Sequence, residues 1–110
     1  MNVNDLATSV HEKAKKEAND NNYTFDIVTI MTIANIIIQL IKLIKELRNS
    51  DEEVAEELKS MGPLRKIALR WMIFRKVKRS AERKTVYEGI RDSFKGLDKD
   101  TVLELVREQK

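Results

Sequence analysis

An uncharged run from Ile27 to Ile41 limits how this chain can fold more than any other feature. Apolar residues continue to dominate as far as Leu47. Its many β-branched isoleucines would also suit a strand. Polar residues nevertheless recur every three or four positions, which is the period of a helix; they are Thr29, Thr32, Asn35, Gln39, Lys42 and Glu46. We therefore predict one long, very hydrophobic helix.

A helix that is apolar around most of its circumference is a core helix, an oligomer interface or a membrane span. The uncharged run would extend ~22 Å at 1.5 Å per residue, which is short of the ~30 Å hydrocarbon core of a bilayer. Asn35 and Gln39 disfavour a span further. We expect burial in protein and keep the membrane as an alternative. The predicted packing or interface residues of this helix are Ile30, Ile33, Ile37, Leu40 and Ile44.

Composition predicts that the rest of the chain is helical too. One proline and three glycines are too few for a turn-rich β fold, and the chain is rich in charged and aliphatic residues. We predict a single all-α domain of about five helices. Its parts are a weakly amphipathic helix and polar loop over 1–22, the central helix and an acidic capped helix over 23–61, and the basic and C-terminal helices over 62–110.

Several helix ends carry capping signals. Asn4 is the expected N-cap of a first helix over Asp5–Ala18, closed by a polar loop over 19–22. Ser50 and Glu53 match a capping box for a third helix. Gly62 followed by Pro63 predicts the sharpest boundary in the chain, with Gly62 in the left-handed conformation after the third helix. Asp98 is the expected cap of a last helix.

The spacing of apolar residues predicts which side of each helix is buried. In the basic helix the inward face changes after Ala81, so we expect a kink or break within 80–85. An unbroken helix that contacts two partners is the alternative. The predicted buried residues outside the central helix are Leu6, Val10, Ala14 and Ala18; Val54, Leu58 and Met61; Leu64, Ile67, Ala68, Trp71 and Phe74; Val86, Ile90 and Phe94; and Val102, Leu103 and Val106.

Positive charge is concentrated between Arg65 and Lys84. This stretch holds nine Lys and Arg residues and one acid, Glu82, a local charge of +8 in a chain whose net charge is +3. Such a concentration requires a nearby anion or wide exposure to solvent. The candidate contacts to an anion or nucleic acid are Arg65, Lys66, Arg70, Arg75, Lys76, Lys78, Arg79, Arg83 and Lys84. Pairing with the acidic residues of 51–57, in this chain or a neighbour, is the alternative.

The same basic stretch contains four large apolar residues in succession, Trp71 to Phe74. They cover every side of one helical turn, which a simple surface helix does not do. Trp71 and Phe74 are therefore predicted to be core or interface anchors rather than platforms for base stacking. Together with the large apolar face of the central helix, these residues indicate that the protein associates with further copies of itself or with other proteins.

Catalysis is not expected. The single histidine, His11, lies among charged residues with no orienting acid or nucleophile nearby. The acidic run from Asp51 to Glu57 fits helix capping better than metal binding. There is no cysteine and no phosphate-binding or zinc motif. We predict neither a metal nor a cofactor.

The function that these patterns favour is a non-enzymatic structural or adaptor subunit of a larger assembly, such as a virion or other multi-protein particle, whose basic helix faces an anionic partner. It would be a homo-oligomer or part of a protein complex. One alternative is a small nucleic-acid-binding protein without sequence preference, and another is a single-span or peripheral membrane protein. The N-terminal residues do not resemble a cleaved signal peptide, so we expect a cytoplasmic protein or a particle component.

Overall fold

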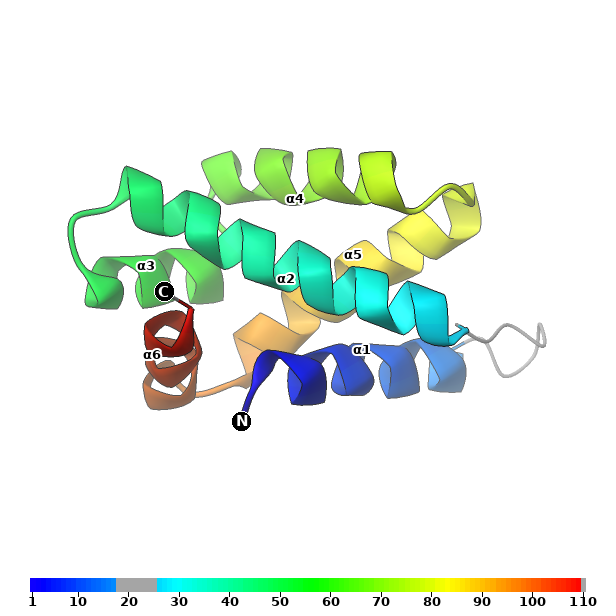
Figure 1. Cartoon of the computed structure of the whole chain (residues 1–110), viewed down its shortest axis with the longest axis horizontal. Coiled ribbons are helices and arrows are strands. Elements are labelled where there is room, and N and C mark those ends of the chain that lie inside the picture. Colours follow the sequence, from blue (N-terminus) through cyan, green and yellow to red (C-terminus); the bar gives the residue numbers. More distant parts are fainter. Residues whose placement is uncertain (18–25, 110) are drawn as a thin grey trace.

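The computed structural model describes residues 1–17 and 26–109, which form six α-helices and no strand (Figure 1). The helices are α1 (Val3–Glu17), α2 (Ile27–Leu47), α3 (Asp51–Ser60), α4 (Pro63–Lys76), α5 (Ser80–Gly96) and α6 (Lys99–Glu108). The all-α class is confirmed, with one helix more than the predicted five. The loop predicted over 19–22 and the buried position predicted for Ala18 lie outside the described residues.

The extra helix arises because the basic segment is interrupted at residues 77–79. The N–H of Val77 donates to the carbonyl of Ile73 at 2.8 Å and closes α4, and Ser80 already begins α5. The break predicted within 80–85 therefore exists, but it lies before that range. Lys78 and Arg79 fall in the connection, where their side chains are exposed.

α1, α3 and α4 pack against α2, which crosses the molecule diagonally (Figure 1). α1 lies along one side of α2 and α4 along the other, while α5 packs against both α1 and α4. α3 and α6 pack against each other at one end. The whole measures 43 × 24 × 21 Å, and its radius of gyration of 13.2 Å is that of a compact domain.

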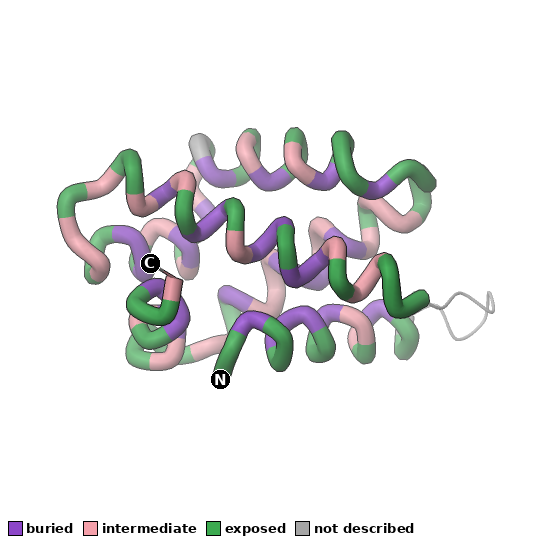
Figure 2. Tube along the Cα trace, viewed as in Figure 1, coloured by how far each residue is buried: buried purple, intermediate pink, exposed green. Residues whose placement is uncertain are grey.

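α2 supplies the centre of the core. Seven of its residues are buried, and the predicted Ile33, Ile37, Leu40 and Ile44 are among them. Ile30 is half-buried against the same cluster. The buried sides of neighbouring helices face α2 in Figure 2. By length and composition alone α2 could also cross a membrane, but here its buried face packs on other helices.

Side-chain caps mark the starts of α1, α3 and α6. α1 begins earlier than predicted, because Asn2 and not Asn4 is its cap: Asn2 Oδ1 accepts from the N–H of Asp5 at 2.8 Å, and Asp5 Oδ2 accepts from the N–H of Asn2 at 3.4 Å. The caps predicted at Ser50 and Asp98 are confirmed by hydrogen bonds at 3.2 and 2.7 Å. Such caps stabilise a helix by about 1 kcal/mol each.

The boundary predicted at Gly62-Pro63 is confirmed, but its geometry differs. Met61, not Gly62, adopts the left-handed conformation (φ 52°), and its N–H donates to the carbonyl of Glu57 at 3.2 Å. The side chain of Met61 is buried, which offsets a backbone cost of about 1–2 kcal/mol. Gly62 has φ −61° and is the N-cap of α4 ahead of Pro63.

Most predicted buried positions outside α4 are confirmed. The exception is in α6, where Leu105 is buried and Leu103 is only half-buried. The buried positions that the structure confirms are Leu6, Val10, Ala14, Val54, Leu58, Met61, Val86, Ile90, Phe94, Val102 and Val106. α1 and α5 approach closely where Gly89 faces Val10: a Cβ at Gly89 would lie 2.7 Å from Val10 Cγ1.

Candidate anion-binding face on α4 and α5

α4 presents its predicted inward side to solvent. Ile67, Trp71 and Phe74, at 69, 61 and 59% exposure, form what we call the apolar ridge. The residues that face the core instead are Leu69, Ile73 and Val77, with Ala68 and Met72 half-buried beside them. Trp71 and Phe74 are therefore not core residues, and their prediction as interface residues stays a prediction. The side chain of Leu64 lies outside the described residues.

The same rotation of α4 buries Arg65 in an ion pair. Arg65 is fully buried, and its guanidinium contacts the carboxylate of Glu57 on α3, which Arg48 also contacts. Burial, with the nearby Arg48 charge, lowers the pKa of Arg65 to about 10. Arg65 lies on the same side of α4 as Leu69 and Ile73, so burying it turns the apolar ridge outward. Its prediction as a contact to an external anion is wrong, because it is enclosed and already paired.

The other eight predicted cations remain at the surface. Lys66, Arg70, Arg75, Lys76, Lys78 and Lys84 are exposed and form no ion pair with any described residue. Arg79 lies 3.8 Å from Glu82 and is 81% exposed. Arg83 is half-buried and donates to the carbonyl of Val77 at 2.6 Å. We call the apolar ridge and these eight cations together the basic face.

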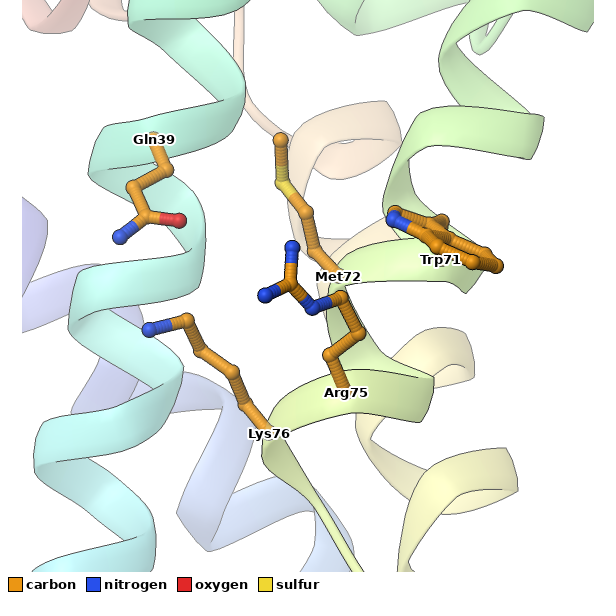
Figure 3. A pocket seen from close by; sticks show the side chains of 5 residues that line it. All are labelled: Gln39, Trp71, Met72, Arg75 and Lys76. Atoms are coloured by element: carbon orange, nitrogen blue, oxygen red, sulfur yellow. The ribbon is translucent and has the colours of Figure 1, made fainter.

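A hollow of about 460 Å³ lies between α2 and α4 along one flank of the apolar ridge. Gln39 projects into it from α2, and Met72, Arg75 and Lys76 extend toward it from α4 (Figure 3). Trp71 forms part of its outer wall. A guanidinium, an ammonium and a side-chain amide converge here without a carboxylate, so the hollow suits an anionic oxygen-rich group such as a phosphate.

A second hollow of about 350 Å³ lies on the other flank, between α4 and α5. Two aromatic rings in it are covered by arginines: Arg83 lies 4.4 Å from the centre of the Phe74 ring, and Arg70 lies 5.0 Å from that of Tyr87. Ile73, Lys84 and Glu88 complete the lining. Cation–π contacts of this kind hold guanidinium groups in a fixed place.

The acidic helix does not neutralise the basic face. Besides the buried pair with Arg65, the ion pairs of α3 run to Arg48 and to α6: Glu56 to Lys99 at 3.7 Å and Glu52 to Arg107 at 3.4 Å. Pairing with the acidic helix of the same chain therefore holds for Arg65 alone among the nine predicted cations. Charge is separated, with α3 and α6 acidic at one end and the basic face elsewhere.

Two residues that line the flanking hollows are not predicted from the sequence. Gln39 was assigned only to the polar stripe of the long helix, and Tyr87 was assigned no role. The signal for Tyr87 was its spacing of four residues from Arg83, which places them on one side of a helix. Nothing local indicates that Gln39 lines the same hollow as Arg75, because that hollow lies between two helices.

The described residues contain no group of three His, Asp or Glu side chains that could hold a metal ion. His11 is half-buried on α1, away from the basic face. Neither a protein-family model nor a curated protein nor a solved structure matches the chain. The geometry of the basic face is therefore the basis for proposing a function.

Proposed function

We propose that the protein is a non-enzymatic adaptor or structural subunit that docks onto an anionic partner through its basic face. The observation that carries this proposal is the set of six cations on and after α4 that lack ion pairs with described residues while flanking an exposed apolar ridge. Folding alone does not favour such an arrangement, because like charges repel and exposed apolar residues gain nothing from solvent.

Contact with an anionic partner would remove both the repulsion among the cations and the exposure of the apolar ridge to water. The cations would gain counter-charges, and Ile67, Trp71 and Phe74 would leave water. The two flanking hollows offer preformed positions for anionic groups, and cation–π contacts hold the arginines of the hollow between α4 and α5 in place, which lowers the entropy lost on binding. Binding should therefore be strong at low salt and weaken steeply as salt rises.

The test is binding of fluorescent anionic probes at about 25 and about 150 mM salt. The probes are an oligothymidylate, a DNA duplex and vesicles containing phosphatidylglycerol. We expect the wild-type protein to bind at least one of them at low salt. The quadruple variant R75Q/K76Q/K78Q/R79Q should lose that binding while keeping its helical circular dichroism, because all four side chains are exposed.

A second quadruple variant, K15Q/K16Q/K95Q/K99Q, is the matched control. It makes the same change in net charge at exposed positions outside the basic face, so it should bind as the wild type does. Equal losses in both variants would mean that net charge alone drives binding, and would contradict a docking face. Failure of the wild type to bind any probe at low salt would also reject the proposal.

A further inference from the structure

We infer that the anionic partner of the basic face is a phospholipid bilayer surface, with the apolar ridge inserted at the level of the headgroups. This inference rests on the proposed function and names the partner. It follows from the order of side chains across α4: an apolar ridge at the crest, cations on both flanks, and a hollow beyond each flank.

The crest of α4 has the chemistry of the bilayer interface. Ile67, Trp71 and Phe74 lie at positions i, i+4 and i+7, opposite the buried side of the helix, so they form its outermost line. Tryptophan concentrates at membrane interfaces, and amphipathic helices bury an apolar face about 5–10 Å into the headgroup and acyl boundary. Ile67 is aliphatic, so it gains from this boundary but has no stacking role on a nucleobase.

The flanks match the headgroup level. Arg70 lies toward α5, with Lys66 one turn earlier on the same side of α4, and Arg75 and Lys76 lie toward α2. Their long side chains can reach lipid phosphates while the crest between them is buried. The hollow between α2 and α4 combines Arg75, Lys76 and Gln39 and would hold one such phosphate, with Trp71 and Met72 beside the glycerol backbone.

The same geometry disfavours single-stranded nucleic acid. Proteins that bind single-stranded nucleic acid use a positively charged groove in which bases stack on exposed aromatic rings. Here the centre of the surface is a convex ridge, and one side of the Phe74 ring and of the Tyr87 ring is covered by an arginine. A second copy of the chain is disfavoured as well, because pairing two identical basic faces would oppose like charges.

Trp71 makes the inference directly measurable, since it is the single tryptophan of the chain and is 61% exposed. The experiment titrates the full-length protein with vesicles of phosphatidylcholine alone and with about one third phosphatidylglycerol. Partitioning is followed by co-sedimentation and by the emission maximum of Trp71. Lipids brominated near the headgroup then report by quenching whether Trp71 reaches the bilayer, and an oligothymidylate serves as the nucleic-acid arm.

We expect binding to the anionic vesicles only, with a blue shift and quenching of Trp71. R75Q/K76Q should weaken partitioning about 25-fold, at about fivefold per cation, and I67S should weaken it about tenfold or more. The controls K15Q/K16Q and I27S remove exposed residues of the same types from outside the basic face, and should stay within about twofold of the wild type.

Three results would overturn the inference in different ways. Binding of the oligothymidylate without binding of vesicles would reject the lipid partner and leave the proposed function standing. Vesicle binding without quenching of Trp71 would place the membrane contact elsewhere on the protein. Binding of neither probe at low salt would reject the bilayer inference, and it would reject the proposed function as well if the DNA duplex also failed to bind.

Discussion

Glu57 forms ion pairs with Arg48 and Arg65. Replacing Glu57 should therefore destabilise the fold far more than replacing the buried Arg65. Glu57→Gln keeps the shape of the side chain but removes its charge, which leaves the fully buried Arg65 and the neighbouring Arg48 without a counter-ion. Removing one partner from a buried ion pair costs about 3–5 kcal/mol. A domain of this size has a total stability of about 5–15 kcal/mol.

Arg65→Met should not destabilise the fold. Glu57 would remain paired with Arg48, and the unbranched methionine would fill the space of the arginine stem. Burial lowers the pKa of Arg65 to about 10, which corresponds to an unfavourable charge burial on the order of 3 kcal/mol that the substitution removes. After the lost packing is deducted, we expect a stability between that of the wild type and about 2 kcal/mol above it.

The assay is urea unfolding followed by circular dichroism, with Arg48→Met as the control. Arg48 is 35% exposed and its loss leaves Glu57 with Arg65, so this change should cost about 1 kcal/mol or less. Any advantage of R65M should shrink as pH rises through about 10, because the folded wild type then releases the Arg65 proton while the unfolded chain keeps it. A loss in R65M as large as that in E57Q would refute the reasoning.

Four further changes test other parts of the fold. Gly89→Ala forces a Cβ against Val10 and should cost about 1–2 kcal/mol net of helix propensity; a double-mutant cycle with Val10→Ala should show losses smaller than the sum. Ile37→Asp places a charge at a fully buried site and should cost about 4 kcal/mol or more, so gel filtration should show unfolded or aggregated protein. Hydrogen bonds from Thr101 lower the pKa of Asp98, so its carboxylate stabilises the fold above about pH 4 and loses this effect as pH falls through the folded pKa; Asp98→Asn should flatten the acid side of the Tm profile. Lys59 donates to the carbonyls of Lys95 and Leu97 at 3.1 and 2.6 Å, so Lys59→Met should cost about 1–2 kcal/mol in urea unfolding.

Features encoded by neighbouring residues could be predicted from the sequence. The polar stripe of α2, the caps at Ser50 and Asp98 and the boundary at Gly62-Pro63 each depend on a few adjacent side chains, and the structure contains all of them. The start of α1 was misplaced because Asn2 and Asn4 are equally good caps. The reciprocal bond from Asp5 decides in favour of Asn2.

The orientation of α4 could not be predicted, because its apolar residues cover more than one side. Periodicity favoured Ile67, Trp71 and Phe74 as the inward face. In the structure the inward face is the one with Arg65, Leu69 and Ile73, and Arg65 contacts Glu57 on a different helix. A charged residue is a poor candidate for burial until its partner is known. The cations of the basic face could thus be predicted from the sequence. Which side of α4 faces solvent could not, because it depends on contacts with other helices.

The packing of α1 on α5 has a consequence for how the protein is made. The ion pair of Lys13 with Asp92, at 2.7 Å, joins residues 79 positions apart, and α5 ends about 50 residues after α2. At roughly 5–20 residues per second, the ribosome needs roughly 2–10 s after finishing α2 to supply α5, whose Val86, Ile90 and Phe94 belong to the same core. During that interval the nascent chain displays a 21-residue apolar helix that by length and composition could enter a membrane. The segment that organises the finished core is therefore also the one most in need of a chaperone while synthesis continues.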